Sequence, residues 1–337
     1  MLLIKEGILK LLNVNSIEEA NPLLYRWFYS IQRMRSYRTI EQIEYRKRLD
    51  LFNYLELSKE LSCNYIFEIK ENNFYGNAKV LSRNFPITSY TRVEHGLYLG
   101  SVVPSRNMAK NTNKIITLSE YRKNYIEKKT DCEVICVGPY IQYAENLFSD
   151  EYMDRMKEIL GRVLLVFPSH SIDALHASFN TDELIDTIKQ YQTCFNTVLV
   201  CLYWKDIALG YAKLYEKAGF RVVTAGNIYD YYFLDRLRTI IELSDMTLSN
   251  NVGTHVGYCV SMNKPHYIFN SSVKYIPGNV SAQREIKSRD NENYTSMKEA
   301  ENEILDNFSN FQETISRKQI ECVNYYWGKT NQSIQGI

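Results

Sequence analysis

Residues 196–226, NTVLVCLYWKDIALGYAKLYEKAGFRVVTAG, contain two apolar runs on either side of an amphipathic segment. The runs at 196–204 and 220–226 are rich in valine and leucine and have the length of strands that are covered on both faces. The segment 207–219 between them predicts a helix that Gly219 ends. Because two parallel strands need such a crossover connection, the sequence predicts one unit of a parallel α/β sheet here.

The same alternation extends to both sides of this unit. Apolar strands bounded by helices are typical of a doubly wound parallel sheet. We therefore predict a Rossmann-like domain over residues 161–270. Its other strands are predicted at 163–171, 245–250 and 264–270, and its other helices at 181–195, 229–244 and 252–263.

The first half of the chain alternates in shorter units. Residues 1–60 have apolar residues at helical spacing. Four apolar runs follow, and a helix capped by Ser119 is predicted between the last two. The predicted fold class is therefore α/β, with residues 1–150 as N-terminal helices and a first Rossmann-like domain, 151–315 as a second, and 316–337 as a C-terminal helix. The four runs lie at 65–69, 91–100, 114–119 and 132–141.

Composition excludes several classes of protein. The 337 residues carry 40 basic and 39 acidic side chains, a net charge of +1, so no global field predicts a nucleic-acid partner. Seven cysteines, an odd number, favour a reducing cytoplasm over a disulfide framework. Cys132 and Cys136 have no second ligand pair nearby, so no metal site is predicted. No apolar run approaches the ~20 residues that span a bilayer, and the first residues lack a signal-peptide pattern.

Residues 25–38, YRWFYSIQRMRSYR, combine four arginines with aromatic side chains. A basic, aromatic helix can lie on an anionic membrane surface. The alternative is a surface helix whose apolar stripe packs on the domain. Both interpretations stay open for this segment.

Ligands bind open parallel sheets outside the carboxyl ends of the strands. In the second half, small polar, cationic or aromatic groups follow each of the first four predicted strands, and this combination suits a nucleotide. The candidates are Ser169, His170 and Ser171 after the first strand, Trp204 and Lys205 after the second, Gly226 and Asn227 after the third, and Ser249, Asn250, Asn251, Gly253 and Thr254 after the fourth.

The group after the fourth strand is the predicted anion site. Residues 249–251 precede a helix whose unpaired N–H groups and dipole favour an anion, and Gly253 would let a phosphate approach closely. The alternative is that Ser249 or Asn251 only caps the helix and the glycine only allows close packing.

Glu94 and His95 end an apolar run of the first half. A histidine can act as a general base because its ordinary pKa of about 6.5 lies near working pH, and Glu94 could orient it. The alternative is a histidine that is hydrogen-bonded in a turn. Among the other histidines, His255 is expected to face the core, and no role is assigned to His176, at the start of a solvent-exposed helix, or to His266, in a strand.

Five segments occur in the order VEHGLYLG (93–100), IITLSEYRK (115–123), VICVGPYI (134–141), VLLVFPSHS (163–171) and ELSDMTLSNNVGTHVGYCVSMNKPHYIF (242–269). In this order they resemble the GT-B glycosyltransferase superfamily. Within it, they are most similar to bacterial capsule and lipopolysaccharide transferases and to the CDP-glycerol glycerophosphotransferases. The resemblance covers roughly residues 90–270.

The resemblance implies two Rossmann-like sheets facing across a cleft, with the C-terminal helix around residues 325–327 returning to the first domain. It implies His95 as the acceptor-side base, residues 249–254 as the donor-phosphate site, and residues 264–265 as the start of the last donor-domain strand. It implies no cofactor besides a nucleotide-sugar donor, a CMP-activated sugar such as Kdo or a sialic acid being one option. The implied acceptor is a bacterial surface polysaccharide or lipopolysaccharide, and the implied location is cytoplasmic, with peripheral membrane contact.

Departures from the pattern keep alternatives open. PSHS at 168–171 stands where enzymes using CMP-activated sugars have a His-Pro pair, which leaves the donor open. The lack of a DxD motif agrees with a metal-independent reaction, and no carboxylate pair decides between inversion and retention. The alternatives are a CDP-glycerol-type polyol-phosphate transferase, a nucleotide-sugar epimerase and a non-catalytic nucleotide-binding Rossmann-like protein.

Overall fold

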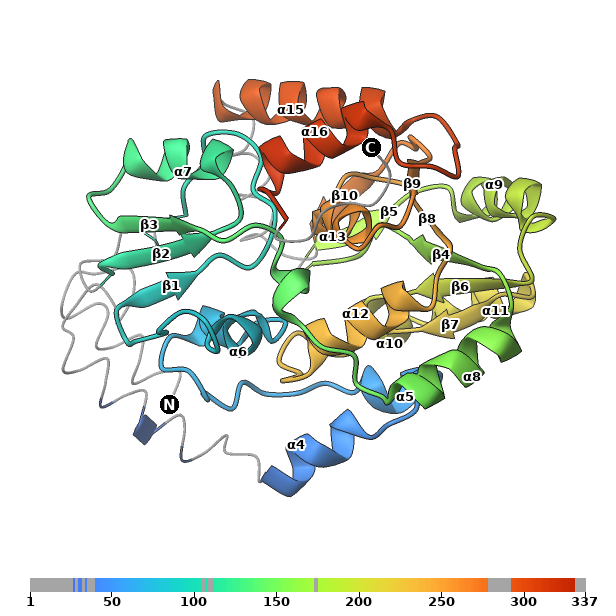
Figure 1. Ribbon diagram of the computed structural model, residues 1–337, viewed down its shortest axis with the longest axis horizontal. Coiled ribbons are helices and arrows are strands. Elements are labelled where there is room, and N and C mark those ends of the chain that lie inside the picture. The colour runs from blue at the N-terminus through green and yellow to red at the C-terminus, as the bar shows by residue number, and fades with distance from the viewer. Residues whose placement is uncertain are drawn as a thin grey trace.

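The computed structural model describes residues 40–104, 107, 112–172, 175–277 and 292–330, with isolated positions between 27 and 34 (Figure 1). Its larger sheet has the strand order β7-β6-β4-β8-β9, and every neighbouring pair is parallel. The five strands predicted in the second half, and their parallel pairing, are therefore confirmed. They are β4 (Val163–Phe167), β6 (Thr197–Cys201), β7 (Arg221–Val223), β8 (Met246–Ser249) and β9 (His266–Ile268).

Helices cover both faces of this sheet. Leu164 and Val166 of β4 belong to one buried cluster with α9 (Thr181–Gln192) and α11 (Ala212–Lys217). Leu165 and Phe167 belong to a second cluster with α12 (Phe233–Glu242) and α13 (Thr254–Ser261). Successive side chains of a strand point to opposite faces, so the division between the two clusters confirms the predicted doubly wound arrangement.

A smaller sheet lies in the first half. Its strands β1 (Thr91–Val93), β2 (Lys114–Thr117) and β3 (Glu133–Cys136) are parallel, in the order β1-β2-β3. Helix α7 (Glu120–Glu127) packs on this sheet, and its cap is the predicted Ser119. Among the described residues of this half, the other helices are α4 (Ile40–Lys47), α5 (Tyr54–Leu57), α6 (Asn77–Leu81) and the 3₁₀ turns η1 (Lys70–Asn73) and η3 (Tyr140–Tyr143).

The apolar run at 65–69 is not a strand. The Asn73 amide accepts from the Phe67 N–H at 3.0 Å and donates to the Phe67 and Ile69 carbonyls at 2.8 and 2.9 Å. Because one side chain satisfies backbone groups that a sheet would otherwise pair, the run folds into turns before η1.

Two predictions for the second half are wrong in detail. The helix predicted over 207–219 is two helices, α10 (Trp204–Ala208) and α11, because Gly210 takes the left-handed φ of +88° between them. The segment around His176 is strand β5 (Leu175–Ser178), which pairs antiparallel with β10 (Lys274–Pro277). His176 therefore lies in a strand and not at the start of a helix.

The C-terminal helix contacts both halves. The chain passes from α8 (Asp150–Leu160) through the larger sheet to α15 (Glu292–Phe308) and α16 (Arg317–Tyr326), and α16 packs on α7 and α13 (Figure 1). Ser119 Oγ donates to the Tyr326 carbonyl at 2.9 Å, which fixes the end of α16 against the smaller sheet. The predicted fold class, α/β with two Rossmann-like parallel sheets, N-terminal helices and a returning C-terminal helix, is confirmed.

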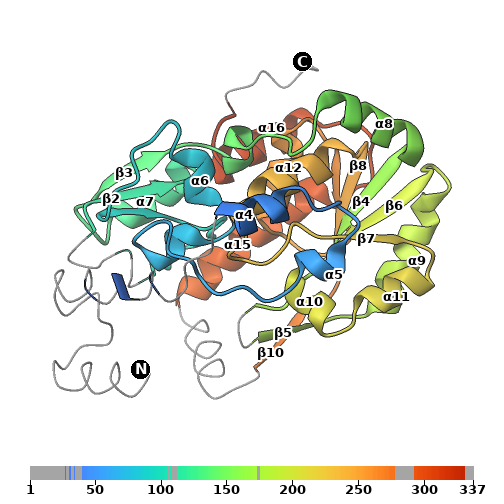
Figure 2. The same cartoon turned by 90° about the horizontal axis from the view of Figure 1, so that it is seen from below.

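The two halves share a buried core. One apolar cluster includes Ile116 of the smaller sheet and Leu165 of the larger one. Figure 2 shows α6 beside α12, where Lys79 and Asp235 form a buried ion pair at 2.6 Å. The domain boundaries at 150 and 315 stay predictions.

Among the described residues, no helix is long and apolar enough to cross a membrane. The basic, aromatic segment 25–38 lies almost wholly outside the described residues, so its membrane role stays a prediction.

Candidate functional site

The loop after β1 touches the start of α13. Leu97 N–H donates to Thr254 Oγ1 at 2.9 Å. A Cβ on Gly96 would lie 2.5 Å from the same oxygen, so only glycine fits at this approach. The structure therefore brings the predicted acceptor-side loop and the predicted donor-phosphate turn into direct contact.

Aromatic side chains connect the two halves beside this contact. The rings of His95 and Tyr75 have centroids 6.2 Å apart, and the Tyr75 hydroxyl lies 3.5 Å from that of Tyr203. Tyr203 in turn packs against His170, with centroids 4.7 Å apart. Together with His255, in the first turn of α13, these side chains form what we call the ring cluster: Tyr75, His95, His170, Tyr203 and His255.

Tyr75 is held in an uncommon backbone conformation. Its φ is +57°, and its N–H donates to the Ile228 carbonyl of the second half at 2.7 Å. Left-handed conformations at non-glycine residues are costly and concentrate at functional sites. Sequence reasoning missed Tyr75, because nothing local to a tyrosine predicts a positive φ.

Glu94 does not orient His95 directly, contrary to the prediction. Its buried carboxylate accepts two hydrogen bonds from Arg122, at 2.9 and 2.8 Å, and one each from Thr117 and Asn107. His95 Nδ1 instead lies 2.9 Å from the Tyr98 hydroxyl. A carboxylate so fully paired by a buried arginine has no oxygen to spare for the imidazole.

Ser249 and Asn250 are fully buried and bonded inward. Ser249 Oγ donates to the Asn251 carbonyl at 2.8 Å and lies 3.0 Å from His266 Nε2. Asn250 Oδ1 accepts from Ser169 N and Oγ, at 2.6 and 3.0 Å. These two side chains hold the turn in shape, so the prediction that they contact a ligand is not supported by their geometry.

The partly exposed end of the turn keeps the features of an anion site. Asn251, Gly253 and Thr254 are partly exposed, and α13 begins at Thr254 with Gly253 as its cap and no capping side chain. The first N–H groups of a helix have no partner within the helix. Thr254 Oγ1 accepts from Leu97 and can still donate its own hydrogen.

Ser169 and Ser171 are also structural. Ser171 is fully buried, its N–H donates to the Asp206 carboxylate at 3.2 Å, and its Oγ accepts from Ala177 N–H at 3.1 Å. His170 between them is partly exposed. Burial lowers the pKa of His170 against the opposing effect of Asp206, whose own pKa burial raises. Burial therefore favours the neutral form of the His170 imidazole.

His255 belongs to this site, although the sequence placed it in the core. Its ring stacks on Phe167 at the end of β4, with centroids 5.0 Å apart, and folds back over Gly253. Its Nε2 is buried without a hydrogen-bond partner. Burial, reinforced by the nearby His170, lowers the pKa of His255 to about 3. The sequence feature that could have predicted it is its position in the first turn of a helix, two residues after a glycine.

The remaining predicted residues are of two kinds, those accounted for by structure and those with a polar group that has no partner. Gly226 has φ +107°, and a Cβ there would lie 3.0 Å from Asp230 and Arg236, so backbone conformation and close packing account for the glycine. Asn227 Oδ1 accepts from the Tyr229 N–H at 3.0 Å, while its buried Nδ2 has no partner. The Trp204 indole N–H is likewise buried and unpaired, and Lys205 is partly exposed.

Two surface hollows lie apart from the ring cluster. One of about 500 Å³ is bordered by α9 and Tyr267, and one of about 380 Å³ by α4 and Phe148. Neither is lined by a residue of the ring cluster. Within the described ranges, no three His, Cys, Asp or Glu side chains are grouped so as to hold a metal ion, and metal independence stays a prediction.

No protein-family model and no curated protein sequence matches the chain. Among solved structures, it is similar to the wall teichoic acid polymerase TagF, at 14% identity and a TM-score of 0.41, with 73% of this chain and 65% of that chain covered. The H548A form of TagF gives 13% identity and a TM-score of 0.44, over 74% and 66% of the two chains. The S. aureus MnaA–UDP complex gives 12% identity and a TM-score of 0.36, with 95% of this chain and 85% of that chain covered. The chain thus spans slightly less than two thirds of TagF, and similarity at this level assigns neither an activity nor site residues.

Proposed function

We propose that the chain is a GT-B-type glycosyltransferase that moves a sugar from a nucleotide donor to a bacterial surface glycan. The observation that carries the proposal is the contact of the Gly96–Leu97 loop with Thr254. This contact brings the loop of His95, which follows β1 of the smaller sheet, against the N-terminus of α13, which follows β8 of the larger sheet. A CDP-glycerol-type polyol-phosphate transferase is the alternative with the same site.

The proposed chemistry uses both sides of this contact. His95 takes the proton of the acceptor hydroxyl as its oxygen bonds to the transferred group, and the bond from that group to the nucleotide phosphate breaks. The N–H groups at the start of α13 stabilise the charge that develops on the departing phosphate. His170 and Lys205 are proposed to assist there.

The nucleotide side is tested by thermal unfolding with CDP, CMP, UDP, GDP and dTDP. A ligand that binds only the folded state at 100 times its Kd adds about 2.7 kcal/mol to the free energy of unfolding. We expect one nucleotide class to raise Tm selectively. No response to any of the five would overturn the proposal.

The His95 role is tested with the nucleotide that this screen selects. His95→Ala should lower turnover by roughly 10²–10⁴-fold, the usual contribution of a general base, and leave the nucleotide-induced rise in Tm unchanged. His176→Ala, in β5 and outside the ring cluster, is the matched control and should change neither quantity. Nucleotide binding without transfer in the unaltered protein would instead favour the non-catalytic alternative.

A further inference from the structure

A chain of contacts leads from a buried ion pair to His95. Glu94 and Arg122 are both buried and joined by two hydrogen bonds of 2.9 and 2.8 Å. The Arg122 guanidinium carbon lies 4.6 Å from the centre of the Tyr98 ring. The Tyr98 hydroxyl lies 2.9 Å from His95 Nδ1. Each link fixes the next, because a bidentate arginine is immobile and a cation over an aromatic face favours one ring position.

We propose that Tyr98 is the positioning residue of His95, and that Glu94 acts on His95 only through Arg122 and Tyr98. For His95 to accept a proton at Nε2, Nδ1 has to carry hydrogen, and the Tyr98 oxygen is then its acceptor. The hydroxyl thus sets both the ring position and the tautomer of the imidazole. The role in turnover rests on the proposed function, but the contact itself does not.

The surroundings of His95 support this assignment. Phe74 and Tyr75 pack on the ring, with centroids 6.2 Å from it, and Asn77 donates to the His95 carbonyl at 3.2 Å. Of these neighbours, Tyr75 and Tyr98 are the titratable groups, and Arg122 and Glu94 are the charged groups behind Tyr98. The Tyr98 hydroxyl lies within hydrogen-bond distance of His95 Nδ1.

The test is Tyr98→Phe, which removes the hydroxyl and keeps the ring under Arg122. Tyr121→Phe is the matched control, because its hydroxyl accepts from the Gly100 N–H at 2.9 Å in the same loop without touching His95. With ¹³C-labelled histidine, the Cε1 signal of His95 is identified by its loss in His95→Gln. We expect Tyr98→Phe to shift this signal and its pH midpoint, and Tyr121→Phe to leave both unchanged.

In turnover, Tyr98→Phe should lower kcat by up to about 100-fold, the scale of a small misplacement of a reacting group, with KM for the donor unchanged. A His95 signal that responds equally to the two variants, or to neither, overturns the proposal. If the unaltered protein transfers no sugar, the proposed function fails and the labelled signal still decides the positioning role. Thermal unfolding of both variants shows whether the fold is kept.

Discussion

Thr254 is the residue at which three parts of the chain meet. Its Oγ1 accepts from Leu97 of the first half, and its carbonyl accepts from the Trp327 indole N–H at 3.1 Å. It also begins α13, directly after the turn that follows β8. A single side chain and its carbonyl therefore connect the proposed acceptor side, the proposed donor side and the C-terminal segment.

The close approach at Thr254 predicts the effect of Gly96→Ala. The new methyl would lie 2.5 Å from Thr254 Oγ1, so the free energy of unfolding should fall by about 1–3 kcal/mol, the usual cost of overpacking. Adding Thr254→Ala removes the obstructing oxygen and should recover part of the loss. Urea denaturation measures both.

Gly210→Ala is the control for this pair. Gly210 has φ +88° and open space around its Cα, so its substitution costs backbone strain alone. Adding Thr254→Ala should recover none of the stability that Gly210→Ala loses. Strictly additive effects of Gly96→Ala and Thr254→Ala would contradict the contact.

At the scale of elements, α16 is anchored by Trp327, the residue directly after its last turn. Trp327 is fully buried, and a Cβ on Gly257 of α13 would overlap its indole ring. Gly257 therefore allows α13 to pack closely on Trp327. Together, α16 and Trp327 hold the first turn of α13 against the smaller sheet.

Trp327→Ala should lower the free energy of unfolding by about 3–5 kcal/mol, as for other buried aromatic side chains. Because the indole donates to Thr254, nucleotide-induced stabilisation should also weaken. Tyr325→Ala, two residues away and 55% exposed, is the control and should cost less than about 1 kcal/mol. Equal effects in guanidinium denaturation would show that α16 is not anchored in this way.

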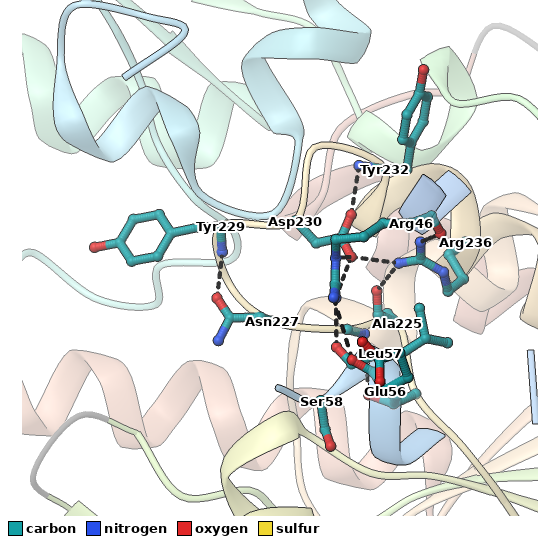
Figure 3. A network of polar contacts seen from close by, with 12 residues as sticks. Arg46, Glu56, Leu57, Ser58, Ala225, Asn227, Tyr229, Asp230, Tyr232 and Arg236 are labelled. Atoms are coloured by element: carbon teal, nitrogen blue, oxygen red, sulfur yellow. Dashed lines mark hydrogen bonds and ion pairs between the residues drawn. The ribbon is translucent and has the colours of Figure 1, made fainter. Parts of the chain in front are cut away.

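At the scale of the whole molecule, buried ion pairs join distant segments. Asp230, before α12, accepts from Arg46 of α4 at 2.8 Å and from Arg236 at 3.1 Å, and Arg46 also donates to the Leu57 carbonyl at 2.7 Å (Figure 3). All three charged side chains are buried. The N-terminal helices are thereby fixed to the second half through charge as well as apolar contact.

Burial opposes ionisation of Asp230, but Arg236 and Arg46 outweigh it and lower its pKa below the ordinary value. A carboxyl whose pKa is lowered in the folded state stabilises the protein above its unfolded pKa of about 3.9, and this contribution is lost as the pH falls through the folded value. Asp230→Asn should therefore cost about 3–5 kcal/mol at pH 7, since it leaves two buried cations unpaired.

The cost of Asp230→Asn should shrink as the pH falls below about 4, because the unfolded carboxyl then binds a proton that the folded carboxylate, with its lowered pKa, does not yet bind. Urea denaturation of both forms at pH 7 and pH 3 measures it. Asp182→Asn, in the first turn of α9 beside a surface hollow, is the control and should cost little at either pH. A cost for Asp230→Asn that is the same at both pH values would mean that its charge is not responsible.

Local pattern predicted the elements well where they were regular. The strands and helices of the second half follow from apolar periodicity over about ten residues, which is a property of neighbouring side chains. The failures have different causes. β5 is a strand because it pairs with β10, about a hundred residues later, whereas 65–69 is not a strand because the nearby Asn73 side chain binds its backbone. Gly210 split a helix because a glycine can adopt a φ that ends one.

The sequence by itself determined the parallel α/β class and the strand ends where polar groups gather. Only the tertiary structure decided which of those groups face inward. Ser169 meets Asn250 across 81 residues and Leu97 meets Thr254 across 157, and no local pattern encodes such distances. A polar side chain at a strand end forms hydrogen bonds with the groups that the fold brings near it. Ser249, Asn250 and Glu94 therefore bond to buried partners. The fold places His95, His170 and His255 in the ring cluster instead.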